Sequence, residues 1–472
     1  MNGVLKNDID TNIKTIKDNF EDELLKERTI INQYNSNVSF GILYFSNLAK
    51  KELISINVIK PILEYSKKFE TNDVLEHVTK NILFINEVKP TKDLFEIYKE
   101  LLRGKTIILC SKNDYCLIVD TDDRKSRAIM EPDVERILRG PREGFVESMM
   151  MNIAMIRNKI MTSKLKFEYI EIGEITKTRG CICYVEDKVD KKALEILRYR
   201  LSKYKPDGIM DTNSIAEHIR DFKYSPFKTT GVTEKPDVIA AKLIEGKTAL
   251  MVDGSPSVIY LPVLFVELFH TDEDYYIGYV FTSVGRLLRL IGFLISIILP
   301  GAYVAVVTHH WEIIPAPLLI AILSSQQGVP FPTVVECAML LTVFELLRES
   351  GLRAPSGIGQ SISVVGAIVV GQAAVEARLV STTMIFIIAL TAISGLITTK
   401  LKGASIIFRF AFLLAGSLLG LYGIYIVLLM LLIHLIRLQS FGVQYTERFF
   451  PFKLKNLKHG LLRLPKRDIN KS

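Results

Sequence analysis

Apolar residues are distributed unevenly along the chain. Before about residue 285, alternating strands and one-sided helices explain the pattern, and no stretch has the roughly 18 apolar residues that a spanning helix needs. Beyond that point almost every segment reaches or approaches this length. The step predicts an N-terminal α/β region of two subdomains, followed by an all-α multispanning membrane domain.

Local patterns predict the elements of the first half. Period-two alternation and turn residues indicate strands at 38–45, 106–109, 115–119, 166–172, 181–185, 248–252 and 257–261. Helical spacing indicates helices within 73–102, at 145–161 and at 191–204. Gly140 and Pro141 punctuate the chain, which places a boundary near residue 140. The expected domains are 1–140, 141–285, 286–440 and a tail at 441–472.

The membrane domain is expected to contain six apolar segments. They cover residues 287–307, 316–323, 333–347, 362–375, 379–399 and 405–438. Pro300 and Gly301 are expected to break the first. The second is too short to span about 30 Å of hydrocarbon and is interpreted as re-entrant or interfacial, near a sheltered cavity at 315–336. The last is either one long helix or two.

The distribution of charged residues predicts on which side of the membrane the chain termini lie. Hydrophobic residues make up 49% of the 472 positions and charged residues 23%, which fits a soluble part joined to a membrane part. The net charge is +8, and the tail from Arg448 onward holds eight basic residues and one acid. The positive-inside rule places this tail in the cytoplasm, where it also attracts anionic lipid. The N-terminus has no apolar leader and is expected in the cytoplasm too, so the number of crossings is even, four or six.

Several patterns that suggest chemistry have ordinary explanations. The Gly-Lys-Thr triplets at 104–106 and 246–248 lack the first glycine of a phosphate-binding loop and precede predicted strands. Cys181 and Cys183 have no second ligand pair for zinc, and His309 and His310 adjoin Trp311 as in an interfacial loop. We therefore expect no catalytic residues, cofactor or metal, and no nucleic-acid partner.

Charged residues at membrane depth are the functional candidates, because each is costly unless it faces a partner or water. Arg286 and Arg289 are explained by snorkelling at the mouth of the first segment. Glu336, Glu376 and Arg409 are predicted to act in an ion path or in gating. An inter-helix polar patch is predicted from Glu345, Arg348 and Gln372, since Glu345 and Arg348 are spaced i,i+3 and Gln372 shares a helix face with Glu376. A pore lining and a packing patch are both consistent with Gln372 and Glu376.

A set of motifs resembles a known family. In the soluble half these are the residues at 139–145, 207–209, 224–227 and 234–237. In the rest they lie at 243–247, 252–256, 328–332, 344–349, 358–360 and 371–377. Together they cover about residues 130–425 and are similar to the A subunit of GerA-type nutrient germination receptors of endospore-forming bacteria.

This resemblance implies a function in the spore inner membrane. The family's receptors contain this subunit, a transporter-like B subunit that holds the germinant, and a lipoprotein C subunit. The A subunit is expected to form a homo-oligomer, a ring of five in one view, that couples germinant binding to monovalent cation release. Glu336 and Glu376 would then line or gate a cation path, because carboxylate rings select for cations.

Two other functions fit the same residues. A secondary transporter would use Glu336 and Glu376 as a coupling site, although the halves of the membrane domain show no matching repeats. A scaffold would use the membrane domain only as an anchor for the cytoplasmic region.

Overall fold

The computed structural model describes residues 3–447 and residue 460. Within that range it leaves out residues 7, 36, 70–72, 86, 123–139, 354–365, 367, 368 and 370. The chain divides into two compact units. The first comprises Met1–Arg220 and Thr230–Pro262, and the second comprises Asp221–Thr229 and Val263–Ser472. Most of the predicted tail 441–472 and much of the predicted segment 362–375 lie outside the described residues.

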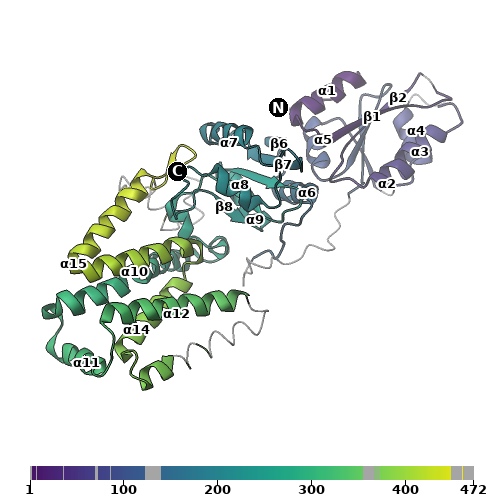
Figure 1. The fold of residues 1–472 in the computed structure, drawn as a ribbon. Coiled ribbons are helices and arrows are strands. Elements are labelled where there is room, and N and C mark those ends of the chain that lie inside the picture. The colour runs from purple at the N-terminus through teal and green to yellow at the C-terminus, as the bar shows by residue number, and fades with distance from the viewer. Residues whose placement is uncertain are drawn as a thin grey trace. The chain divides into compact units, whose positions relative to one another are not determined.

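The first unit contains two five-stranded antiparallel sheets (Figure 1). The first sheet has the order β1-β2-β4-β5-β3. Its strands are β1 (Leu25–Ile31), β2 (Ser39–Phe45), β3 (Val88–Thr91), β4 (Thr106–Cys110) and β5 (Cys116–Val119). Its helices are α1 (Ile9–Phe20), α2 (Lys51–Leu53), the π-helical η1 (Ile54–Ile59), α3 (Lys60–Glu64), α4 (Val74–Asn81) and α5 (Leu94–Leu101).

The second sheet has the order β6-β7-β9-β10-β8. Its strands are β6 (Leu165–Ile172), β7 (Thr178–Val185), β8 (Gly231–Thr233), β9 (Thr248–Val252) and β10 (Val258–Leu261). The helices are α6 (Met149–Lys159), α7 (Lys191–Lys203), α8 (Thr212–Ile219) and α9 (Pro236–Ile244). Every residue of β9 and β10 is buried, which explains their continuous apolar sequences.

The predicted helical region 73–102 is interrupted by a strand. Residues 88–91 form β3 between α4 and α5. Its sequence Val-Lys-Pro-Thr has neither the alternation nor the apolar content that identifies a strand, and β3 lies at an edge of the sheet, where Pro90 is tolerated. Pairing with β5 therefore decides its conformation.

The second unit is mainly helical. Its long helices are α10 (Tyr279–His309), α12 (Thr333–Arg353) and α15 (Lys402–Arg437), and its shorter ones are α11 (Ala316–Gln326) and α14 (Thr382–Leu396). Short 3₁₀ segments are η2 (Phe265–Phe269), η3 (Asp272–Tyr275), η4 (Trp311–Ile313) and η5 (Thr399–Leu401). A small hairpin, β11 (Gln439–Ser440) and β12 (Val443–Gln444), follows α15.

Two helices in the described part of the chain are long and apolar enough to cross a bilayer. They are Tyr279–His309 and Thr399–Arg437. The predicted break at Pro300 is wrong, because α10 continues through that residue. The next residue, Gly301, lies against α15, and a Cβ there would stand 2.5 Å from the carbonyl oxygen of Phe412. Packing against a neighbouring helix thus holds the helical path despite the hydrogen bond that proline removes.

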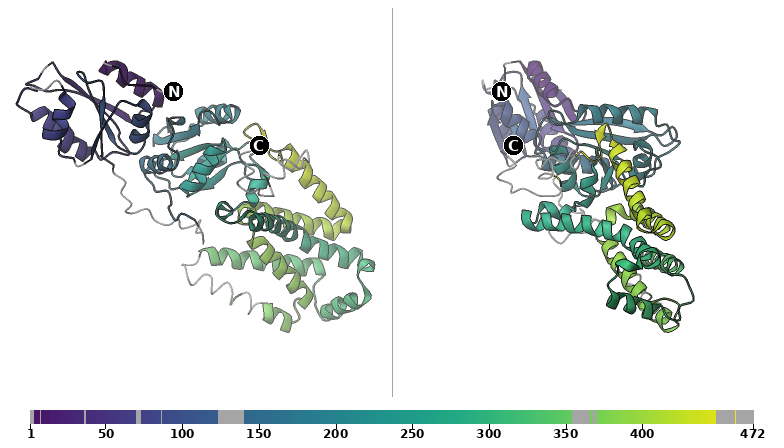
Figure 2. Two further views of the ribbon diagram at one scale, coloured as in Figure 1. Left: turned by 180° about the vertical axis from the view of Figure 1, so that it is seen from behind. Right: turned by 90° about the vertical axis from the view of Figure 1, so that its left-hand side faces the viewer.

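The last apolar segment forms two helical legs that meet at Gly420. This residue has φ 60° and ψ −143°, a conformation that is essentially restricted to glycine. A Cβ at Gly423 would collide with the carbonyl of Ala415, whereas eight residues of straight helix would separate these positions by about 12 Å. The bend is therefore sharp, and the first leg of α15 packs along α10 (Figure 2).

Residues 221–229 belong to the helical unit because they pack on the end of α15. The Ser225 hydroxyl lies 2.9 Å from Nε2 of His434, and the Tyr445 hydroxyl donates to the carbonyl of Lys228 over 2.8 Å. The Phe227 ring contacts the rings of Phe265 and His434. Side chains from distant parts of the sequence thus close this end of the unit.

Candidate functional site

Arg409 lies at the centre of the helical unit. It projects from α15 and is 1% exposed. Its Nη1 donates to Oε1 of Glu345 on α12 over 2.7 Å, and its Nε donates to the carbonyl of Ser296 on α10 over 2.9 Å. An ion pair and a backbone acceptor therefore compensate this buried charge, which has no acid in its own helix.

Glu345 pairs with two cations. Its second carboxylate oxygen contacts Arg348, one turn further along α12. The guanidinium groups of Arg348 and Arg409 both lie near the Phe344 ring, at 5.8 and 6.0 Å from its centroid. We call Glu345, Arg348 and Arg409 the Glu345 cluster. Gln372, which the sequence assigned to the same patch, is exposed and forms no hydrogen bond or ion pair with the cluster in the described part of the chain.

Glu336 lies nearer the start of α12, at the N-terminus of α14. It is 1% exposed. Its Oε1 accepts hydrogen bonds from the backbone N–H of Ser381 and from the Ser381 hydroxyl, the latter over 2.7 Å. Ser381 is the N-cap of α14, so the carboxylate sits where the helix dipole favours a negative charge.

An apolar layer separates Glu336 from the Glu345 cluster along α12. Cys337 and Leu341 lie between the two glutamates in sequence and are fully buried. They pack in one cluster with Val304, Met384, Ile388 and Leu413. The core of the helical unit thus alternates between a polar level, an apolar level and a second polar level.

Glu376 differs from the other candidates. Residues 371–376 are helical, and Glu376 is exposed. In the described part of the chain it has no ion-pair partner, and Arg378 nearby packs its side chain against Gly328. The isolated chain therefore leaves this carboxylate available to lipid headgroups, water or another subunit.

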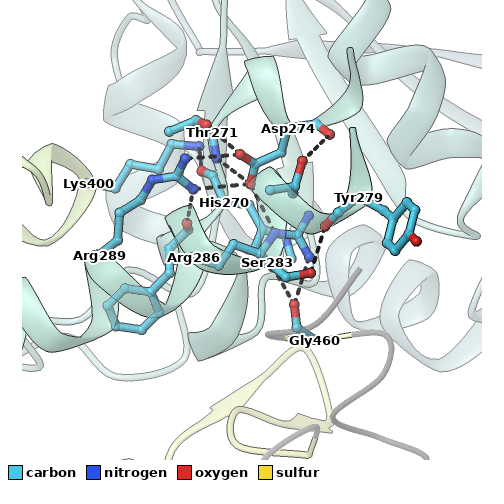
Figure 3. A network of polar contacts seen from close by, with 11 residues as sticks. His270, Thr271, Asp274, Tyr279, Ser283, Arg286, Arg289, Lys400 and Gly460 are labelled. Carbon is cyan, nitrogen blue, oxygen red and sulfur yellow. Dashed lines mark hydrogen bonds and ion pairs between the residues drawn. The ribbon is translucent and has the colours of Figure 1, made fainter. Parts of the chain in front are cut away.

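A third polar network lies at the start of α10 (Figure 3). Asp274 of η3 accepts hydrogen bonds from Nε of Arg286 at 3.0 Å and from Nη2 of Arg289 at 3.0 Å. Burial opposes ionisation of this carboxyl, but hydrogen bonds and Coulomb attraction from the two arginines outweigh it and lower the pKa of Asp274. Arg286 also donates to the carbonyl of Gly460 over 2.8 Å. Both arginines are tied to Asp274, so the snorkelling interpretation is wrong.

Sequence reasoning missed Asp274 because it treated the two arginines as isolated side chains. The available signal was the acidic run Asp272-Glu273-Asp274, which ends 12 residues before Arg286. A short turn, η3, brings the acid back to the first turns of α10. A buried arginine close in sequence to an acid is better explained by pairing than by snorkelling.

The other residues that the sequence suggested for chemistry lie in places that do not fit a phosphate loop, a reactive thiol or a metal site. Glycines 104 and 246 precede β4 and β9, and not the helices that a phosphate-binding loop requires. Burial raises the pKa of Cys181 well above its ordinary value, which suppresses thiolate chemistry. Nε2 of His309 lies 2.8 Å from the carbonyl of Ser417, beside the bend of α15. Among the described residues, no group of three or more His, Cys, Asp and Glu side chains forms a potential metal site.

Comparison with known proteins identifies the family. The profile of the Bacillus/Clostridium GerA spore germination protein matches residues 11–472. The chain belongs to the GerA family of spore germination proteins. It is 36% identical over 446 residues to spore germination protein KA of Bacillus subtilis (strain 168), covering 94% of this chain and 81% of that protein.

Other GerA relatives have a similar extent. Identity to spore germination protein A1 of Bacillus subtilis (strain 168) is 33% over 447 residues, covering 94% of this chain and 91% of the relative. A crystal structure of the N-terminal domain of the A subunit of the Bacillus megaterium spore germinant receptor GerK3 is 25% identical. It matches 56% of this chain and 98% of that domain with a TM-score of 0.45. The family profile and the identities of 36% and 33% to the two named relatives confirm the family resemblance seen in the sequence motifs.

Proposed function

We propose that this GerA protein is the A subunit of a nutrient-responsive germinant receptor, and that its helical unit gates the release of monovalent cations across the spore inner membrane. It would act with a transporter-like B subunit and a lipoprotein C subunit, as a homo-oligomer with both termini in the cytoplasm. The named relatives, which are spore germination proteins, support the receptor role.

The observation that carries the gating role is the pair of buried polar levels in the helical unit. Glu336 and Arg409 are each 1% exposed, and an apolar layer lies between their levels along α12. Charged groups inside a membrane bundle are costly and occur mainly in pathways and switches. An apolar constriction between polar levels can block ions when it is dry and pass them when it is hydrated.

Coupling to the nutrient requires two states of this core. A partner that binds the nutrient can shift the equilibrium only if it contacts the two states differently. Ion pairs of the Glu345 cluster join α12 to α15, and the hydrogen bond from Arg409 to the Ser296 carbonyl joins α15 to α10, so a movement of one of these helices changes one of these contacts. The Glu345 cluster would therefore differ between the two states of the switch.

The experiment compares the initial rates of nutrient-triggered potassium and sodium release from spores that carry Glu336→Gln or Glu376→Gln. A channel predicts a changed rate or a changed ratio of the two ions at normal subunit abundance. A secondary transporter predicts loss of stoichiometric substrate uptake, and a scaffold predicts no change in either variant. Glu349→Gln is the matched control, since Glu349 is an exposed residue of α12 that pairs with Arg353.

A further inference from the structure

Glu336 belongs to a larger group of polar side chains from four helices. Its members come from α10, α11, α12 and the N-terminus of α14, and all carry oxygen atoms. We call this group the Glu336 cluster: Tyr303, Ser325, Gln326, Glu336, Ser381 and Thr383. Two of its helices, α11 and α14, are short apolar helices. Gln326 lies at the C-terminal end of α11, and the C-terminal ends of broken helices coordinate cations in transport proteins.

The cluster is only partly satisfied by its own hydrogen bonds. The hydroxyls of Ser325 and Thr383 lie 2.6 Å apart. The Tyr303 side chain lies within interaction range of Gln326, Thr383 and Glu336. Nevertheless, the buried hydroxyl of Tyr303 and the buried Nε2 of Gln326 have no hydrogen-bond partner among the described residues. Buried polar atoms without partners are rare and call for an explanation.

Apart from the dipole at the N-terminus of α14, the negative charge of Glu336 is not balanced within this cluster. Both hydrogen bonds to Glu336 come from Ser381, a neutral donor, and both go to Oε1. Oε2 has no hydrogen-bond partner among the residues that the structure describes. The contrast with Glu345 is direct, because that carboxylate at the other polar level is paired with two arginines. A buried carboxylate without a cationic partner is costly.

We propose that the Glu336 cluster binds one monovalent cation that has lost part of its water shell. Oε2 of Glu336 supplies the charge, and the hydroxyls of Tyr303 and Thr383 supply neutral oxygen ligands. A half-turn of the Gln326 amide presents its oxygen to the same place. One carboxylate with neutral oxygens balances a single positive charge, whereas calcium sites of the EF-hand type gather several carboxylates.

This inference rests on the proposed function and deepens it, because the site would hold the conducted ion beside the apolar layer. An occupied site stabilises the closed arrangement of α10, α11, α12 and α14 by binding the folded state alone. Movement of α11 or α14 would separate the oxygen ligands and release the ion. The site therefore links ion affinity to the positions of these helices.

The test uses the purified full-length chain in detergent and measures its thermal unfolding in potassium chloride and in choline chloride of equal ionic strength. Potassium is expected to raise the unfolding temperature of the wild type. Tyr303→Phe and Thr383→Val each remove one hydroxyl ligand, so the potassium concentration for half the effect should rise about tenfold. Glu336→Gln should abolish the effect.

Two control variants separate ligand loss from general destabilisation. Tyr425→Phe alters an exposed tyrosine of α15, and Thr391→Val removes a hydroxyl of α14 that bonds to the carbonyl of Ile387. Both should keep the wild-type response to potassium. If the Tyr303, Thr383 and Glu336 variants lower the unfolding temperature equally in both salts, these residues have a structural role only and the proposal is overturned. The proposal is also overturned if the unfolding temperature of the wild type is the same in potassium chloride and in choline chloride.

The failure of this site can be told apart from the failure of the proposed function. Salt-specific stabilisation is measured on the resting chain without nutrient or partners. If it is absent while Glu336→Gln still alters cation release from spores, the site is refuted and gating stands. If stabilisation is present while release is unchanged, the site is supported and the gating role is refuted.

Discussion

Arg409 of α15 and Glu345 of α12 form an ion pair of 2.7 Å, although 64 residues separate them in the sequence. The pair joins the two helices at a level where Arg409 is 1% exposed. Arg348 adds a second cation to the same carboxylate. The helical unit is thus stabilised by a charge cluster whose members come from different helices. Substitution of these residues therefore measures how much the cluster contributes to stability.

Glu345→Gln should destabilise the helical unit strongly. It leaves Arg409 buried without a counter-charge, which costs about 3–5 kcal/mol of unfolding free energy. The double variant Glu345→Gln with Arg409→Met removes the orphaned cation and should recover part of that loss. Thermal unfolding of the purified chain measures both values, and equal stability of the single and double variants contradicts the pairing.

Gly301 and Gly416 should resist substitution because they bring α10 and α15 into close contact. A Cβ at Gly416 would lie 2.6 Å from the carbonyl oxygen of Gly301, and a Cβ at Gly301 would meet Phe412. Gly301→Ala and Gly416→Ala are each expected to cost about 1–3 kcal/mol through overpacking. Gly403→Ala is the control in α15, since a Cβ there meets no atom within 4 Å.

The bend of α15 should depend on Gly420. Alanine at this position is strained at φ 60°, and its Cβ would approach the His310 ring at 2.7 Å. The expected cost of Gly420→Ala is about 1–3 kcal/mol from backbone strain alone. Distances between spin labels on the two legs of α15 test the geometry, and unchanged distances with unchanged stability contradict this account of the bend.

Asp274 should make stability depend on pH in the acid range. Its folded-state pKa is lowered from 3.8, so its ion pairs contribute fully above the unfolded-state value and are lost as the pH falls through the lower folded-state value. Asp274→Asn should therefore be less stable than the wild type at neutral pH, and the difference should shrink below about pH 4. Unfolding temperatures of both proteins across this range measure the effect, and a pH-independent difference contradicts it.

Sequence patterns predicted the elements whose burial is regular. Strands β9 and β10 carry continuous apolar residues between turn residues, and their bounds agree with the prediction within one residue. Strand β3 was missed because Lys89 and Pro90 break the apolar pattern by which a strand is recognised in the sequence. Its pairing with β5 makes it a strand. The continuity of α10 at Pro300 likewise depends on contact with α15, which no local pattern contains.

The candidate residues could be chosen from the sequence, but their partners could not. Burial of Glu336 and Arg409 follows from charge placed in apolar segments. The partners Ser381 and Glu345 lie 45 and 64 residues away, so packing of the helices alone brings them together. The buried hydroxyl of Tyr303, which has no hydrogen-bond partner among the described residues, has no signal in the sequence, because a single tyrosine in an apolar segment does not show where its hydroxyl lies.

Potassium release from spores in which this chain carries Glu336→Gln decides whether this carboxylate acts in gating, with nutrient added and subunit abundance checked by immunoblot. Release is expected to be slow or absent at normal abundance and to be restored in part by Glu336→Asp, while Glu349→Gln spores release potassium at the wild-type rate. Wild-type release from Glu336→Gln spores at normal abundance would contradict a role for this carboxylate in gating.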